Sequence, residues 1–97
     1  MFISISSFVI ANDMVQEVQE AFRNRPRLVD QAPGFVRMEV FFPQQNPHEF
    51  WLMTYWSDEE SFTAWYKSHQ YHDSHAGIPK GVKLVPNSVS VKYFNQF

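Results

Sequence analysis

Two closely spaced segments that are apolar on both faces most constrain how this chain folds. Phe35–Phe42 reads FVRMEVFF and Phe50–Trp56 reads FWLMTYW, with the polar residues 44–47 between them. Aromatic and β-branched residues favour strands, and a short polar connection predicts an antiparallel pair. Neighbouring strand residues point to opposite faces, so Phe41 and Phe42 need cover on both sides of one sheet.

Two more strands and one helix are predicted around this pair. Phe2–Ile10 and Ser88–Phe94 have strand composition. Between the first and second strands, apolar residues recur at helical spacing from Met14 to Val29, with Asn12 or Asp13 as the expected N-cap. Proline is costly inside a helix, so the helix is predicted to kink or restart at Pro26.

A second helix is predicted after Trp56. Ser57 is the expected N-cap, with Glu60 at the capping-box position three residues later. Phe62 and Trp65 then recur at helical spacing, together with Tyr66 and His69.

The order strand, helix, strand, strand, helix, strand predicts an α+β fold of the ferredoxin-like βαββαβ type. Right-handed crossovers place both helices on one face of a four-stranded antiparallel sheet. The length of 97 residues predicts a single domain over residues 1–97. Because the strands are apolar on both faces, the other face is expected to pack against a second sheet in a homodimer.

Composition excludes several classes of function. The chain has no cysteine, hence no disulfide framework or thiolate metal site. A net charge of −2 without a Lys/Arg cluster gives no footprint for nucleic acid. No apolar run approaches the roughly 20 residues of a membrane span. The N-terminus has no signal-peptide pattern, so a cytoplasmic location is expected.

The stretch from Tyr55 to Gly77 is the strongest candidate for a binding site. It combines a helix rich in aromatic residues with a short segment carrying His69, His72 and His75. This combination suits the wall of a pocket for a flat apolar ligand with a central metal. On one continuous helix His69 and His75 would diverge by about 120°, which argues against a three-histidine zinc site.

Other residues contribute to the same hypothesis. On the first strand, Ser4 and Ser6 are small and would leave room above one face of the sheet. On the first helix, Phe22 is a candidate for lining the same pocket. Arg37 and Glu39 share one face of the second strand. They could pair across a dimer or line a polar channel, and the simplest interpretation is a surface ion pair.

Four landmarks carry a resemblance to a known family: residues 32–35 (APGF), residues 55–57 (YWS), the pair Phe62 and Trp65, and residues 74–77 (SHAG). Together they resemble the antibiotic biosynthesis monooxygenase superfamily, and within it the haem-degrading monooxygenases of the iron-regulated surface determinant type. The resemblance implies a dimeric α+β barrel.

The resemblance also implies roles for individual residues. His75 matches the axial ligand of the haem iron, and Trp65 matches a tryptophan that presses against the porphyrin and is needed for turnover. Ser6 stands where these enzymes have an asparagine that donates a hydrogen bond on the distal side. The implied activity is oxidative haem degradation with iron release. It needs O₂ and an external electron donor, because the chain has no flavin or nicotinamide motif.

The serine at position 6 keeps two alternatives open. A serine offers one donor where an asparagine amide offers two N–H groups. The chain could therefore be a non-catalytic haem-binding protein. It could also be a cofactor-free oxygenase of a phenolic or quinol substrate, with His75 or His72 as the base.

Overall fold

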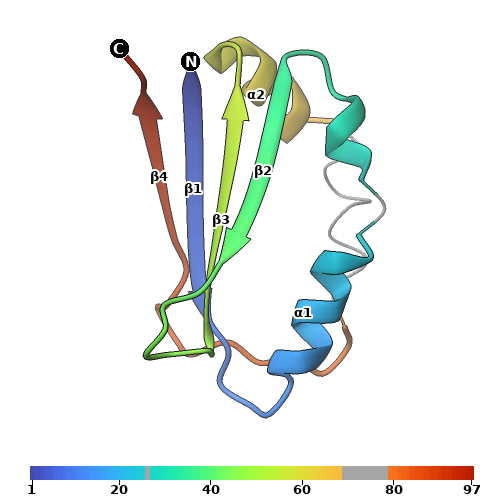
Figure 1. The fold of residues 1–97 in the computed structure, drawn as a ribbon, viewed down its shortest axis with the longest axis vertical. Helices are drawn as coiled ribbons and strands as arrows, with labels where there is room; N and C mark the ends of the chain where they lie inside the picture. The colour runs from blue at the N-terminus through green and yellow to red at the C-terminus, as the bar shows by residue number, and fades with distance from the viewer. Residues whose placement is uncertain (26, 69–78) are drawn as a thin grey trace.

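The computed structural model describes residues 1–25, 27–68 and 79–97 (Figure 1). The elements are β1 (Phe2–Val9), α1 (Val15–Arg23), the 3₁₀ helix η1 (Leu28–Gln31), β2 (Phe35–Phe41), β3 (Glu49–Trp56), α2 (Glu59–Tyr66) and β4 (Ser90–Asn95). This is the predicted order, and the predicted helical segment is divided into α1, which ends at Arg23, and η1, which begins at Leu28.

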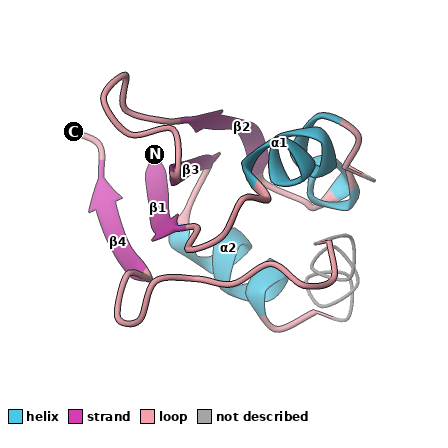
Figure 2. Cartoon of the chain, turned by 90° about the horizontal axis from the view of Figure 1, so that it is seen from below, coloured by secondary structure: helices cyan, strands magenta, loops and turns pink. Residues whose placement is uncertain are grey.

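The four strands form one antiparallel sheet in the order β2-β3-β1-β4. Viewed along the strands, α1 and α2 lie on the same, concave side of the curved sheet (Figure 2). The predicted α+β, ferredoxin-like arrangement is therefore confirmed. No helix in the described ranges is long and apolar enough to cross a membrane.

Strand pairing fixes which side chains share a face. Phe2 pairs with Trp56 and Ser6 pairs with Leu52, so even-numbered residues of β1 and β3 lie on one face. Phe62 of α2 packs against both Phe2 and Trp56, which identifies this face as the one covered by the helices. We call it the helix face, and the opposite one the outer face.

The start of α1 differs from the prediction. Asn12 and Asp13 were the expected N-caps, but the helix begins at Val15, with Met14 at the N-cap position and no capping side chain. The Asn12 amide instead donates a hydrogen bond to the Gly81 carbonyl at 2.8 Å. The Asn12 side chain, predicted to cap the helix, therefore forms a hydrogen bond with a segment distant in sequence.

The start of α2 is also shifted by one residue. The cap is Asp58, whose Oδ1 accepts a hydrogen bond from the Ser61 backbone N–H at 2.7 Å. The prediction of Ser57 as the cap, with a capping box to Glu60, was wrong. Aspartate and serine are both strong N-caps, and the sequence offers them at adjacent positions.

Candidate functional site

Two separate hydrophobic clusters hold the helices to the sheet. The Trp56 cluster has four buried members: Phe2, Val29, Trp56 and Trp65. The Phe50 cluster has three: Ile10, Val18 and Phe50. Along β1, Phe2 belongs to the first cluster and Phe8 packs against the second, so the middle of the strand lies between them.

Short polar side chains occupy that middle region. Ser4 pairs with Thr54 of β3, and Ser6 pairs with Leu52. Ser4 is buried and Ser6 is half-buried. Because serine side chains cannot fill the space that the flanking aromatic residues fill, the helix face carries a polar interruption between its two clusters. Ser6, which the family resemblance implies as the distal donor, lies in this region.

Trp65 lies on α2 within the Trp56 cluster and is buried, with 7% of its surface exposed. Leu28 and Met38 pack against the same cluster. Trp65 is therefore a core residue in this structure, at the end of the helix face occupied by α2.

Phe22 lies on α1 at the other end. Its ring packs against Phe50, with centroids 5.9 Å apart. Phe50 in turn stacks on Phe8 at 5.5 Å with an interplanar angle of 3°. Phe22 and Trp65 thus belong to different clusters, and the serines of β1 lie between those clusters in the strand direction.

The predicted iron ligand His75 lies outside the described residues, as do His69 and His72. Within the described ranges, no group of three or more His, Cys, Asp or Glu side chains could hold a metal ion. The remaining histidine, His48, is half-buried in the β2–β3 connection.

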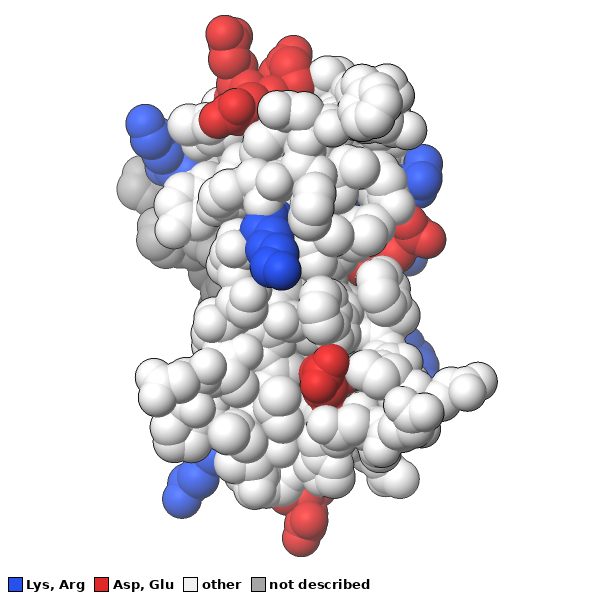
Figure 3. Space-filling model, turned by 90° about the vertical axis from the view of Figure 1, so that its left-hand side faces the viewer, with Lys and Arg blue, Asp and Glu red and all other residues white. Residues whose placement is uncertain are grey.

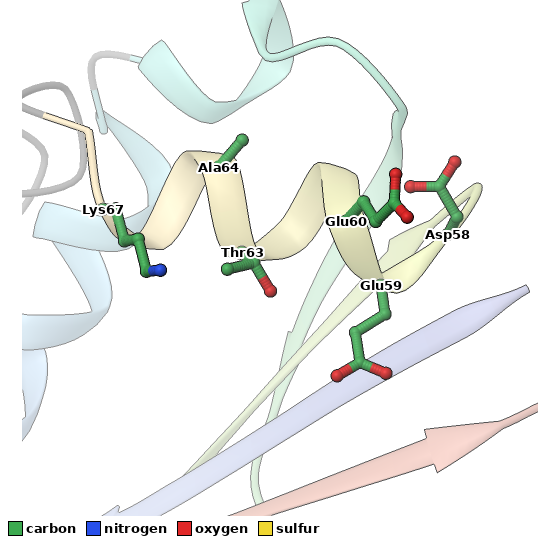
Figure 4. A pocket seen from close by; sticks show the side chains of 6 residues that line it. All are labelled: Asp58, Glu59, Glu60, Thr63, Ala64 and Lys67. Carbon is green, nitrogen blue, oxygen red and sulfur yellow. The ribbon is translucent and has the colours of Figure 1, made fainter.

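A hollow of about 730 Å³ lies along the surface of α2. Figure 4 shows the side chains that line it, with carboxylates at the start of the helix and Lys67 near its end. All of its lining residues come from Asp58 and α2 with its C-cap, so no second element encloses a ligand there. Hydrogen bonds from the Ser61 backbone and side chain lower the pKa of Asp58, which marks a helix cap.

A second, more apolar groove lies between α1 and β2, with a volume of about 350 Å³. It is lined by Gln19, Phe22, Arg23, Val40, Phe41, Phe42 and Phe50. Sequence reasoning did not find this groove, although it singled out Phe22. It is formed by residues from α1 and from the strands, and only the tertiary structure brings them together.

The outer face carries the predicted ion pair. Arg37 Nε lies 3.5 Å from Glu39 Oε1, with both side chains about half exposed. The Arg37 guanidinium also lies 3.8 Å from the centroid of the Tyr55 ring, a cation–π geometry. The remaining positions of this face are mainly apolar.

One curated relative matches about half of the chain. Over 49 residues the chain is 29% identical to the mycobilin-producing heme oxygenase of Mycobacterium tuberculosis H37Rv. The match covers 50% of this chain and 47% of that protein, so it spans about half the length of the curated relative.

Two solved structures illustrate the range of similar folds. A mutant of MhuD, with two manganese protoporphyrin IX molecules bound per active site, superposes with a TM-score of 0.80 at 20% identity, covering 99% of this chain and 94% of that one. A mutant of SnoaB from Streptomyces nogalater, a cofactor-independent oxygenase, gives a TM-score of 0.76 at 13% identity, covering 98% of this chain and 91% of that one.

The family is established by a match that spans most of the chain. Residues 1–77 fit the family described as antibiotic biosynthesis monooxygenase, and this stretch includes β1, α1, β2, β3 and α2. The chain therefore belongs to the antibiotic biosynthesis monooxygenase family.

Proposed function

We propose that this chain binds haem and degrades it oxidatively, with release of iron. The observation that carries the proposal is the 29% identity to the mycobilin-producing heme oxygenase, over half of the chain. The similarity to MhuD, whose mutant holds manganese porphyrin in its active site, supports it at the level of the fold.

The described residues suit a flat apolar molecule. The short side chains of Ser4 and Ser6 lie between the two hydrophobic clusters on the helix face. Phe22 and Trp65 supply large rings from two different helices. Aromatic walls around a small number of polar groups are typical of cofactor-sized pockets.

In this proposal His75 holds the haem iron as a neutral imidazole, which is a common proximal ligand. Trp65 and Phe22 contact the porphyrin and orient it. The Ser6 hydroxyl donates the distal hydrogen bond that an asparagine amide donates in the haem-degrading relatives. Haem is the substrate, O₂ is the oxidant, and an external donor supplies the electrons.

The decisive experiment is a haem titration followed by addition of ascorbate in air, with the visible spectrum recorded throughout. A Soret band that forms and then bleaches supports haem degradation. The His75→Ala variant should lose the band, whereas His48→Ala should keep it as a matched control. A band that forms and persists identifies a non-catalytic haem-binding protein, and absence of a band contradicts the proposal.

A second candidate is a cofactor-free oxygenase of a phenolic or quinol substrate. The fold similarity to SnoaB, a cofactor-independent oxygenase, favours it, as does the serine at position 6. In this case His75 or His72 acts as the base. Oxygen consumption with such a substrate, in protein free of metal and haem, would distinguish it from haem degradation.

We also propose that the outer face forms a homodimer. Its strand positions are mainly apolar: Ile3, Ile5, Val9, Phe41, Trp51, Met53, Tyr55 and Phe94. On the side of the molecule that carries β4, the charged side chains are separated from one another by uncharged surface (Figure 3). A second copy packed sheet to sheet would remove this apolar surface from water.

A further inference from the structure

The groove between α1 and β2 combines an aromatic lining with one cation. Phe22, Phe42 and Phe50 contribute rings, and Val40 adds an aliphatic side chain. Phe42 and Val40 are exposed, at 47% and 37% of their surface. An aromatic groove left open to water is a candidate binding surface, because filling it with an apolar molecule removes this area from solvent.

Arg23 differs from the other arginines of the chain. The three ion pairs formed among the described residues are Arg25–Asp30, Arg27–Asp30 and Arg37–Glu39. Thus three of the four arginines have a carboxylate partner, and Arg23 has none within the described part of the chain. Glu20 precedes it by one helical turn, yet no ion pair joins them.

The polar groups of the groove lie on one side of α1. Gln19 and Arg23 are four residues apart, so they are neighbours on the helix surface, and both line the groove beside Phe22. A guanidinium presents paired N–H donors that match the two oxygens of a carboxylate. An amide beside it can donate a further hydrogen bond.

We propose that the α1–β2 groove is a binding site for a small aromatic carboxylate. Arg23 holds the carboxylate, with Gln19 beside it, and Phe22, Phe50 and Val40 contact the ring. A volume of about 350 Å³ is at the lower end of the range for ligand pockets, which suits one or two fused rings. The inference does not depend on His75. With a free acid as ligand the groove is a site separate from the proposed function, and with a porphyrin propionate as ligand it extends the proposed haem site.

The test uses 2-naphthoate as the probe, titrated into the purified protein by isothermal titration calorimetry. We expect saturable binding, and a loss of affinity of about tenfold in Arg23→Gln, the scale of a charge-assisted hydrogen bond. Arg37→Gln, on the outer face, should bind as the wild type does. Naphthalene-2-carboxamide has the same shape without the charge, and its weaker binding should not respond to Arg23→Gln.

The carboxylate could belong to a free acid or to a porphyrin propionate, since Phe22 lines the groove and is also proposed to contact haem. If the natural ligand is a free acid, the haem-loaded protein binds 2-naphthoate with the same affinity as the haem-free protein. If the carboxylate belongs to a propionate, haem blocks 2-naphthoate and Arg23→Gln weakens haem binding.

Two results would overturn the proposal: no saturable binding of 2-naphthoate, or equal affinity in the wild type and in a folded Arg23→Gln variant. Thermal unfolding of the variant, which alters an exposed residue, establishes that it is folded. Absence of a Soret band in the wild type would contradict the haem proposal and would leave the 2-naphthoate result unaffected, so the two proposals fail separately.

Discussion

Gly34, in the turn before β2, lies directly against Ser61 of α2. A Cβ atom on Gly34 would be 2.2 Å from Ser61 Oγ and 2.4 Å from Ser61 Cβ. Gly34 also has a φ of +84°, in the region that favours glycine, and its carbonyl accepts a hydrogen bond from Ser57 N at 2.8 Å. The turn entering β2 and the first turn of α2 are therefore one packed unit.

This contact predicts that Gly34→Ala destabilises the protein by about 2–4 kcal/mol, from backbone strain and overpacking together. Gly81→Ala is a matched control, because Gly81 has a φ of +91° but its nearest neighbour to a Cβ would be Met14 Sδ at 3.6 Å. Gly81→Ala should therefore lower the free energy of unfolding only by the backbone strain, about 1–2 kcal/mol. Urea unfolding of both variants measures the difference, and equal losses would contradict the steric argument.

Asp58 makes stability depend on pH. The hydrogen bonds from the Ser61 backbone and side chain lower the pKa of its carboxyl in the folded protein. The stabilisation is therefore fully present above the unfolded pKa, near 3.9, and is lost as pH falls through the folded pKa. The wild type should unfold at a higher temperature than Asp58→Asn at pH 7, and the difference should shrink as the pH falls below the unfolded pKa.

Circular dichroism melts at pH 7 and at a series of acidic pH values test this prediction. Glu59→Gln removes a carboxylate from the same turn without altering the bond between Asp58 and Ser61, so it serves as the control. A difference between wild type and Asp58→Asn that is independent of pH would show that the cap does not depend on ionisation.

Strand composition predicted the sheet well, because side chains on a strand alternate and both faces here are apolar. Phe2–Ile10 was expected and Phe2–Val9 is observed, while the last strand is Ser90–Asn95 in place of Ser88–Phe94. Helix caps were predicted less well. Asparagine is a favoured N-cap residue, but the Asn12 amide donates a hydrogen bond to the Gly81 carbonyl. The sequence around Asn12 does not predict that contact.

The candidate site was predictable only where single residues carry the signal. Alternation along the first strand predicted that Ser4 and Ser6 share one face of the sheet, and the register confirms this. The contacts of Phe62 then identify this face as the helix face. The groove between α1 and β2 could not be found, because nothing local to Arg23 distinguishes it from Arg25 or Arg27. Only the ion pairs of the folded chain separate them.

Replacing Ser6 tests the distal role proposed for it. An asparagine at this half-buried position offers two N–H donors instead of one hydroxyl donor. We therefore expect Ser6→Asn to bleach haem faster than the wild type under ascorbate and air, and Ser6→Ala to bleach it more slowly. One positioned hydrogen bond commonly changes a rate by about tenfold to a hundredfold.

The matched control is Ser7→Ala, which alters the neighbouring serine on the outer face of β1. Equal bleaching rates in Ser6→Asn, Ser6→Ala and the wild type would remove Ser6 from the mechanism. Equal rates would not contradict haem binding, because the Soret band measures that step separately.

Met53 lies at the centre of the outer face, paired with Ile5 on one side and Glu39 on the other. In a sheet-to-sheet homodimer Met53→Glu would bury a second carboxylate beside that of Glu39, which costs several kcal/mol. Met53→Glu should therefore raise the dimer dissociation constant by at least about a hundredfold. Gln16→Glu adds the same charge on exposed α1, on the other side of the sheet, and should leave the dimer intact. Sedimentation velocity over a range of concentrations measures the dissociation of both variants. A wild type that stays monomeric would refute the homodimer. A dimer that persists in Met53→Glu would show that the interface lies on another face.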